Sequence, residues 1–254
     1  MCLILVAWHA HPDFPLVVAA NRDEFHDRPS APADYWPGHP DLLAGRDLRG
    51  GGTWLGITRG GRFAALTNFR GSEHLKPDGP SRGGLVTGFL TDSRTPDVYL
   101  DAVTPEASCY SGFNLLVSDG KTLGWLGNVG MHRRLLPPGI YGLSNALLDT
   151  PWPKVEQSKS ALAAALHALP DCHPLFDLLR DDRTYSEEQL PRTGVDIAFE
   201  QLLSAAFVRS PVYGTRNSTV LIEDIRGKRL FLEQTWSPDG EPTKWRQFEL
   251  SPIH

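Results

Sequence analysis

Cysteine is scarce in this sequence: three occur among 254 residues, at Cys2, Cys109 and Cys172, and no two form a CxxC pair. A sparse, odd-numbered set of thiols argues against a disulfide framework and indicates a reducing compartment, so we expect the protein in the cytoplasm. The sequence also has no run of about 20 apolar residues, the length that a membrane-spanning helix requires. Its apolar start, residues 2–8, lacks the basic segment of a secretory signal and is not expected to be one.

An excess of basic residues is absent as well, because 30 acidic residues outnumber 25 basic ones and the formal net charge is -5. Nucleic acid is therefore not expected as a partner, since phosphate binding needs clustered Lys and Arg. A metal site is not expected either. His9 and His11 lie on one turn, but no carboxylate or cysteine completes a ligand set at suitable spacing. No pattern in the sequence indicates an oligomeric state.

Apolar residues make up 41% of the chain and charged residues 22%, which is typical of a globular protein. The length suits one large or two small domains, and we expect residues 1–254 to form a single domain. The 24 glycines and 21 prolines indicate many tight turns between the apolar runs.

Short apolar and β-branched runs between turn residues predict strands. We expect strands at residues 3–8, 16–20, 50–58, 63–68, 113–118, 122–127, 139–144, 218–224, 229–235 and 244–250. We expect helices at 81–92, with Ser81 as the N-cap, and at 95–107, 154–169, 174–182 and 195–207, whereas residues 28–40, with four prolines, show little regular pattern. This order fits two antiparallel sheets covered by helices better than a doubly wound parallel sheet. We predict an α+β fold, a four-layer α-β-β-α sandwich.

Cys2 directly follows the initiator methionine, which is normally removed before a small residue. Removal would leave a thiol and a free α-amine on one residue. Such an amine has a pKa of about 7.7–8.0 in peptides, so near neutral pH part of it is an unprotonated base beside its own nucleophile. The alternative is that Cys2 is a small apolar residue at the start of a buried strand, as free cysteines commonly are.

Four polar residues, Asn21, Arg22, Asp23 and Glu24, directly follow the second predicted strand. If the first two strands form one hairpin, this cluster lies opposite the start of the first strand and brings Asp23 or Arg22 close to the N-terminus. A carboxylate there would hold the α-ammonium, and a guanidinium would lower the thiol pKa. The alternative is an exposed loop, whose Arg-Asp pair contributes less than about 1 kcal/mol.

Two further segments are candidates for ligand contacts. The glycines at 50–52 lack the Gly-Lys-Ser/Thr that completes a phosphate loop, so the segment is predicted to be a tight turn that places Trp54 near a cleft. The alternative for Trp54 is a place in the core, where tryptophans are commonly found. Arg82 opens a predicted helix, and a helix N-terminus can receive an anion such as a carboxylate.

These residues resemble the NRDE family, whose eukaryotic members are called transport and Golgi organisation proteins. The resemblance rests on the Met-Cys start, on the polar cluster at 21–24, and on GGGTWLG at residues 50–56. It continues through ALTNFR at 65–70, SRGGL at 81–85, YGLSN at 141–145 and YGTRNST at 213–219. Because these motifs occur in order over most of the chain, the sequence is identified as a member of this family.

The family in turn resembles the cysteine N-terminal-nucleophile (Ntn) hydrolases, which include penicillin V acylases and bile salt hydrolases. This second resemblance implies an Ntn-hydrolase-like sandwich with Cys2 as the nucleophile and Asp23 in contact with its amine. It further implies that Asn68 and Asn145 stabilise the oxyanion of the intermediate, and that Arg216 corresponds to a late arginine of those enzymes.

One position departs from the hydrolase pattern. Those enzymes carry an arginine three residues before the aspartate, where this chain has Ala20, and Arg22 lies one residue before the aspartate instead. We expect an amidohydrolase or acyl transferase acting on a small amide or acyl compound, with Asn21, Arg22, Trp54 and Arg82 contacting the substrate. The resemblance also implies an alternative, a non-catalytic carrier of haem or of acyl-CoA and other lipids. No bound cofactor is expected, and the sequence has neither the CxxCH nor the Cys-Pro motif of haem sites.

Overall fold

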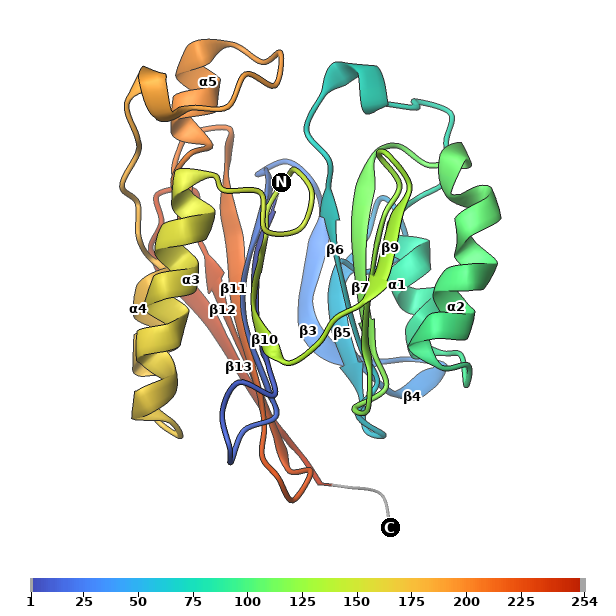
Figure 1. The fold of residues 1–254 in the computed structure, drawn as a ribbon. Helices are drawn as coiled ribbons and strands as arrows, with labels where there is room; N and C mark the ends of the chain where they lie inside the picture. The colour runs from blue at the N-terminus through green and yellow to red at the C-terminus, as the bar shows by residue number, and fades with distance from the viewer. Residues whose placement is uncertain (1, 252–254) are drawn as a thin grey trace.

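Two antiparallel β-sheets stack face to face in the computed structural model, which describes residues 2–251 (Figure 1). The first sheet contains, side by side, β10 (Gly139–Leu143), β1 (Cys2–Trp8), β2 (Leu16–Phe25), β11 (Tyr213–Glu223), β12 (Arg229–Trp236) and β13 (Pro242–Leu250). The second contains, in chain order, β3 (Ser30–Trp36), β4 (His39–Asp47), β5 (Leu55–Thr58), β6 (Phe63–Asn68), β7 (Phe113–Ser118), β8 (Leu123–Gly127) and β9 (His132–Leu135).

Helices cover the outer face of each sheet (Figure 1). On the side of the first sheet lie α3 (Pro153–Ala165), α4 (His173–Leu179) and α5 (Ile197–Leu202), and on the side of the second lie α1 (Gly83–Leu90) and α2 (Pro96–Val103). Short 3₁₀ segments occur at Ser72–His74, Thr104–Cys109, Leu166–Ala168 and Glu187–Gln189. This arrangement confirms the predicted α+β fold in four α-β-β-α layers. Within residues 2–251, no helix combines the length and the apolarity needed to cross a membrane.

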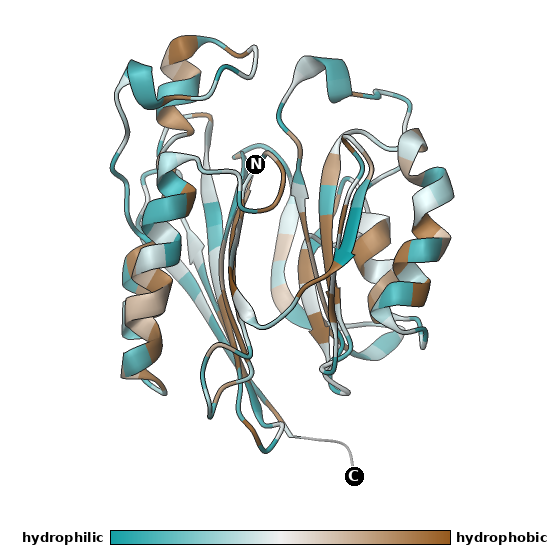
Figure 2. Ribbon diagram, in the orientation of Figure 1, coloured by the Kyte–Doolittle hydropathy of each residue, from teal (hydrophilic) through white to brown (hydrophobic). Residues whose placement is uncertain are grey.

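Strand β1 separates two apolar cores, which explains why its sequence is apolar without alternation. Ile4 and Val6 belong to the core between the sheets, whereas Leu3 and Leu5 belong to the core beneath α3 and α4. A third core lies between the second sheet and the helices α1 and α2. In Figure 2, hydrophobic segments accordingly gather along the strands of both sheets. A strand covered on both faces buries every side chain, which accounts for the burial of all seven residues of β1.

The region that was expected to be irregular, residues 28–40, contains all of β3 and the start of β4. Strand β3 lies at the edge of its sheet, and its register with β4 shifts between Ala31 and Asp34. Proline has no amide hydrogen to donate, but at an edge or a bulge none is needed, so Pro32 is compatible with the strand. The prediction of irregular structure here is therefore wrong, because the edge position and the bulge accommodate the proline.

Two predicted helices differ from the structure at their ends. Helix α1 begins at Gly83 with Arg82 at the N-cap position and no side-chain cap, so Ser81 is not the N-cap. The helix expected at 195–207 is reduced to α5, which begins after Asp196 and ends at Leu202. The Asp196 carboxylate accepts hydrogen bonds from two amides of the first turn, which explains this start.

Candidate active site

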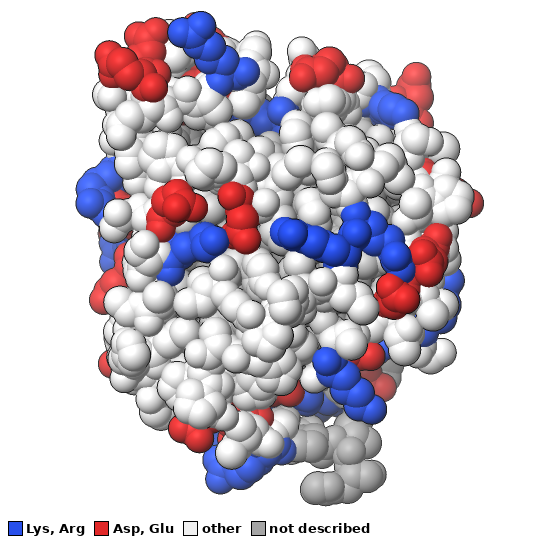
Figure 3. All heavy atoms as spheres, viewed as in Figure 1, with Lys and Arg blue, Asp and Glu red and all other residues white. Residues whose placement is uncertain are grey.

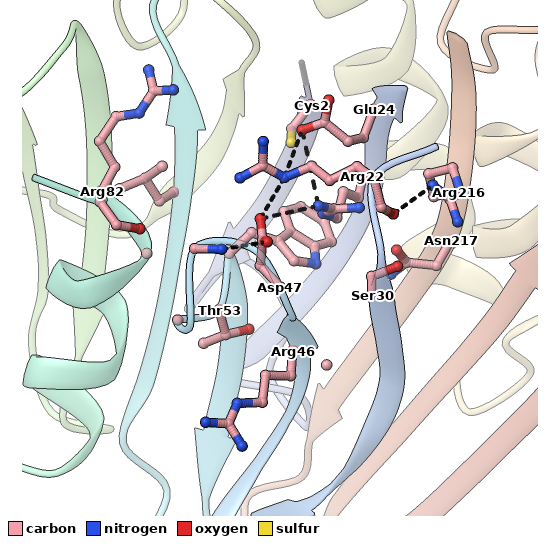
Figure 4. A pocket seen from close by; sticks show the side chains of 18 of the residues that line it. Cys2, Arg22, Glu24, Ser30, Arg46, Asp47, Thr53, Arg82, Arg216 and Asn217 are labelled. Carbon is pink, nitrogen blue, oxygen red and sulfur yellow. Dashed lines mark hydrogen bonds and ion pairs between the residues drawn. The ribbon is translucent and has the colours of Figure 1, made fainter. Parts of the chain in front are cut away.

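Cys2 lies at one end of β1, beside a cavity of about 490 Å³ whose walls come from both sheets (Figure 4). Seven of the nine residues expected at the site line this cavity: Cys2, Arg22, Asp23, Trp54, Asn68, Arg82 and Arg216. They come from segments far apart in the sequence, and the stacking of the two sheets brings them together. The other two, Asn21 and Asn145, are not among the residues that line it.

The hairpin register places the polar cluster beside the nucleophile candidate. Cys2 pairs with Arg22, and Leu3 pairs with Asn21. Because successive side chains of a strand point to opposite faces, Arg22 shares the inter-sheet face with Cys2. The predicted proximity of Arg22 to Cys2 is confirmed, although the cluster continues β2 instead of forming a loop after it.

Asn21 faces the opposite way, toward the helices. Its Nδ2 donates to the carbonyl oxygens of Leu179 at 2.7 Å and Ala206 at 2.8 Å, and its Oδ1 accepts from Ser218 Oγ at 2.6 Å. The residue is fully buried. Asn21 was expected to contact the substrate, but the strand alternation directs its side chain away from the cavity, where it fastens β2 to the helical layer.

Two arginines and two carboxylates form a network in the cavity wall (Figure 4). Arg28 Nε lies 2.7 Å from Asp47 Oδ2, while Arg22 Nη2 lies 3.6 Å from the same oxygen and 3.9 Å from Glu24 Oε2. Partial burial acts to raise the pKa of the Asp47 carboxyl, but hydrogen bonds from Gly50 N and Arg28 hold it below the usual value. The second nitrogen of the Arg22 guanidinium, Nη1, is buried and has no hydrogen-bond partner among residues 2–251.

Cys2 as a whole residue is only 7% exposed. Burial raises the pKa of this thiol, and the Asp23 carboxylate raises it further, whereas Arg22 and a hydrogen bond from the Asp23 backbone lower it. The net direction is upward, so the environment favours the neutral thiol. A nucleophilic Cys2 therefore needs a base that removes its proton during attack.

The Asp23 carboxylate is held on the side of β2 that faces the end of α5. Its Oδ1 accepts from Thr215 Oγ1 at 2.7 Å, and Thr215 Oγ1 in turn accepts from Val208 N at 2.9 Å. Tyr213 Oη donates to the Asp23 carbonyl oxygen at 3.0 Å. Burial raises the pKa of the Asp23 carboxyl, and the Lys154 ammonium and the Thr215 hydrogen bond act against that rise.

Arg216 reaches the cavity because β11 carries a bulge. The register between β11 and β2 shifts between Thr215 and Asn217, so Arg216 is the extra residue. A bulge re-aims the side chain that it carries. The Arg216 Nη1 donates to the carbonyl oxygens of Phe25 at 2.8 Å and of Arg28 at 3.2 Å, so the guanidinium closes the loop that follows β2.

Asn68 and Asn145, the two expected oxyanion donors, take different positions. Asn68 ends β6 and lines the cavity. Asn145 is fully buried behind it, and its Nδ2 donates to the Asn68 carbonyl oxygen at 2.8 Å. Ser144 Oγ bridges this pair to the nucleophile candidate, lying 3.3 Å from both Asn145 Oδ1 and the Cys2 carbonyl oxygen. In this arrangement Asn145 positions Asn68 and does not itself reach the cavity.

Trp54 fulfils both of the roles considered for it. The side chain is half-buried against the core between the sheets and also lines the cavity. Arg82 lines the cavity from the start of α1, where its Nη1 donates to the Gly112 carbonyl oxygen at 3.0 Å.

Sequence reasoning missed Glu233, a carboxyl in the cavity wall that is 2% exposed. Its Oε1 accepts from Ala33 N at 2.7 Å and its Oε2 from Asn217 Nδ2 at 3.0 Å. Burial raises the pKa of Glu233 to about 7. The sequence did contain an indication of this buried carboxyl, because Glu233 directly follows the apolar pair Phe231 and Leu232 within the predicted strand at 229–235. No group of three His, Cys, Asp or Glu side chains suited to a metal ion occurs within residues 2–251.

Two charged residues behind the cavity were also missed. Lys154 is buried, its Nζ donates to the Leu203 carbonyl oxygen at 2.7 Å, and burial lowers its pKa to about 8. Arg70 forms a buried ion pair with Glu200 of α5. Both cations act electrostatically on Asp23. They supply positive charge near the Asp23 carboxylate and act against the rise of its pKa.

The family model described as Transport and Golgi organisation 2 matches residues 1–238. A Transport and Golgi organization protein 2 homolog of Homo sapiens is 38% identical over 276 residues, which cover 99% of each chain. The homolog of Mus musculus is 36% identical over 268 residues, and the Drosophila melanogaster protein is 27% identical over 279 residues, in both cases covering 96% of each chain.

Two solved structures resemble this one at low sequence identity. A Caenorhabditis elegans N-acylethanolamine-hydrolyzing acid amidase ortholog is 12% identical, with a TM-score of 0.47, over 87% of this chain and 92% of that one. A mutant conjugated bile acid hydrolase from Clostridium perfringens is 10% identical, with a TM-score of 0.49, over 98% of this chain and 92% of that one.

Proposed function

The chain belongs to the Transport and Golgi organisation 2 family, and we propose that it is an amidohydrolase or acyl transferase whose nucleophile is the thiol of Cys2 once Met1 has been removed. The observation that carries the proposal is the position of Cys2, at the end of a buried strand and in the wall of a polar cavity. A cysteine that served only to fill the core would not need the amide, guanidinium and carboxylate groups gathered around it.

The acylation step follows from the thiol and the amine on one residue. The free α-amine of Cys2 takes the thiol proton as Sγ attacks the acyl carbon, and the carbonyl electrons move to the oxygen. The Asn68 amide lines the cavity and donates to this oxyanion. When the intermediate collapses, the bond to the leaving amine breaks, the α-ammonium returns the proton to that amine, and a thioester on Cys2 remains.

Deacylation reverses the proton transfer. Water gives a proton to the α-amine and attacks the thioester carbon, and the departing Cys2 thiolate regains that proton, which releases a carboxylic acid. An amine acceptor in place of water would give acyl transfer. Acylation needs the base because burial raises the pKa of the thiol, and deacylation needs it to take a proton from the attacking water.

The neighbouring groups then have separate roles. The Asp23 backbone contacts the thiol, and its buried carboxylate lies close enough to stabilise the α-ammonium that forms during attack. Arg22, opposite Cys2 in the register, favours the thiolate. Asn145 acts through Asn68 and is a positioning residue.

Acylation of Cys2 by p-nitrophenyl acetate tests the proposal. The protein is first shown by intact mass to lack Met1, and peptide mass spectrometry then locates the acetyl group. We expect the acetyl group on Cys2, with turnover that is lost in Cys2→Ala. The variant Cys109→Ala/Cys172→Ala is the matched control, because it removes the other two thiols and should keep the adduct.

Two results would count against catalysis. One is an adduct confined to the exposed Cys109, and the other is turnover that survives Cys2→Ala. Reversible ligand binding with no adduct on Met1-free protein would favour the carrier alternative, to which the polar cavity lining gives no specific support.

A further inference from the structure

The cavity beside Cys2 has a charge opposite to that of the chain. Its walls carry seven basic and four acidic residues, whereas the whole sequence has 25 basic and 30 acidic ones. The outer face seen in Figure 3, by contrast, shows basic and acidic groups interspersed. A concave surface with an excess of one charge raises the local concentration of ions of the other sign. The imbalance therefore points to an anionic occupant.

The acidic residues of the walls do not cancel this excess. Glu24 and Asp47 already face Arg22 and Arg28. The Asp23 carboxylate is bonded to Thr215 on the side away from the core between the sheets. The fourth acid, the Glu233 carboxyl, is occupied by two hydrogen bonds from other elements. Positive charge consequently remains on the cavity wall.

Arg22 has an unused donor at the site. Its side chain is 9% exposed, and Nη1 is buried with no partner among the residues that the structure describes. Its ion pairs with Asp47 and Glu24 run through Nη2, at 3.6 and 3.9 Å. A buried charged donor that lacks an acceptor is costly, and an anionic oxygen from a ligand would satisfy it.

Arg82 supplies a second guanidinium from the other sheet's side of the cavity. It donates through Nη1 to one backbone carbonyl, and within residues 2–251 it forms no ion pair with a carboxylate. It lies close enough to Cys2 for the two groups to interact electrostatically. Planar guanidinium groups bind carboxylate and phosphate oxygens in paired hydrogen bonds.

We infer that the substrate of the Cys2 site is an anionic acyl compound, whose carboxylate or phosphate group is bound by the guanidinium groups of Arg22 and Arg82. This inference rests on the proposed function, and it adds the chemical class of the substrate. The reacting carbonyl then lies at Cys2, with whose side chain both guanidinium groups interact electrostatically from the cavity wall.

A matched pair of acyl esters tests the inference. p-Nitrophenyl valerate and the p-nitrophenyl monoester of glutaric acid have acyl chains of equal length and differ in that the second ends in a carboxylate. We measure the second-order rate constant for acylation of Cys2 in the Met1-free protein. Charge-assisted hydrogen bonds predict that the glutarate ester reacts about tenfold faster or more, and that inorganic phosphate competes with it.

Two variants decide whether the preference belongs to this site. Arg82→Gln should reduce the ratio of the glutarate to the valerate rate constant by about tenfold. Arg226→Gln is the matched control, since this arginine is 82% exposed outside the cavity, and it should leave the ratio unchanged. If inorganic phosphate slows acylation by the valerate ester as well as by the glutarate ester, the phosphate site overlaps the site of the acyl chain. That result would indicate a phosphate-bearing substrate.

Failure of the inference is distinguishable from failure of the proposed function. Equal rate constants for the two esters, with acylation of Cys2, would overturn the anionic substrate and leave the nucleophile in place. If neither ester acylates Cys2, the proposed function fails, and calorimetric titration with glutarate and with inorganic phosphate then measures anion binding directly. Undetectable binding of both, or equal binding to wild type and Arg82→Gln, would overturn the anion site.

Discussion

Glu233→Gln should change how the stability of the protein depends on pH. The carboxyl lies between the sheets, where it accepts hydrogen bonds from Ala33 N of β3 and from Asn217 Nδ2 of β11. Burial raises the pKa of this carboxyl from 4.5 to about 7, although both hydrogen bonds and the charge of Arg22 act against the rise. The folded protein therefore holds the Glu233 proton over a range of pH in which the unfolded chain has released it.

The sign and the size of the effect follow from these two pKa values. Between pH 4.5 and about 7 the folded state binds more protons than the unfolded state, so the free energy of unfolding falls as the pH rises. Below this window both states are protonated, and above it both are ionised. Each pKa unit corresponds to about 1.4 kcal/mol, so the ionised carboxylate lowers the free energy of unfolding by about 3 kcal/mol.

Urea unfolding at about pH 5 and about pH 8, followed by tryptophan fluorescence, measures this difference. From about pH 5 to about pH 8 the free energy of unfolding should fall by about 2–3 kcal/mol more in the wild type than in Glu233→Gln. Any hydrogen bond that the amide fails to make is independent of pH and cancels in the comparison. Glu249→Gln is the control, because that carboxylate is 56% exposed on β13. Equal pH dependence in the wild type and Glu233→Gln would refute the reasoning.

Two further predictions concern the structure around the cavity, and chemical denaturation measures both. Arg70→Met leaves the Glu200 carboxylate buried without its guanidinium partner and should lower the free energy of unfolding by about 3–5 kcal/mol. Adding Glu200→Gln removes the unpaired charge and should recover part of this loss. A double variant that is no more stable than Arg70→Met would contradict the prediction. Gly52→Ala places a Cβ 2.5 Å from the backbone of Gly83 and should cost about 1–3 kcal/mol. Gly84→Ala is the control, because a Cβ at that position has no atom within 4 Å, and it should stabilise α1 by about 0.5–1 kcal/mol. Equal changes in the free energy of unfolding for the two variants would disprove the close approach of Gly52 to the Gly83 backbone.

The hairpin of β1 and β2 shows what local sequence can predict. Two strands that follow each other along the chain and are joined by a short loop, here residues 9–15, commonly pair as antiparallel neighbours, so the proximity of Arg22 to Cys2 follows from the chain alone. The order of strand and helix segments along the chain likewise indicated the layered fold. Strand β9 shows the opposite case. Its four residues are exposed, and it is a strand only because it pairs with β8.

Contacts between the sheets could not be predicted in this way. Glu233 and Asn68 share a cavity because β12 and β6 belong to sheets that pack face to face, and no short-range pattern encodes that packing. The position of Asn145 behind Asn68 likewise depends on where β10 ends relative to β6. An amide at a strand end looks the same in sequence whether it faces a cavity or supports a neighbour. Only the three-dimensional arrangement separates the two roles.

The polar cluster at 21–24 carries the most consequential difference between sequence and structure. As a loop, its four side chains would act together beside Cys2. As a strand, they alternate, so Arg22 and Glu24 line the cavity while Asn21 and the Asp23 carboxylate bond to groups on the helical side. The cluster thus joins the cavity beside Cys2 to the helical layer that holds Asp23 in place. A change to Arg22 or Glu24 acts on the cavity wall, and a change to Asn21 acts on the position of β2. A change to Asp23 removes the carboxylate that is proposed to stabilise the α-ammonium of Cys2.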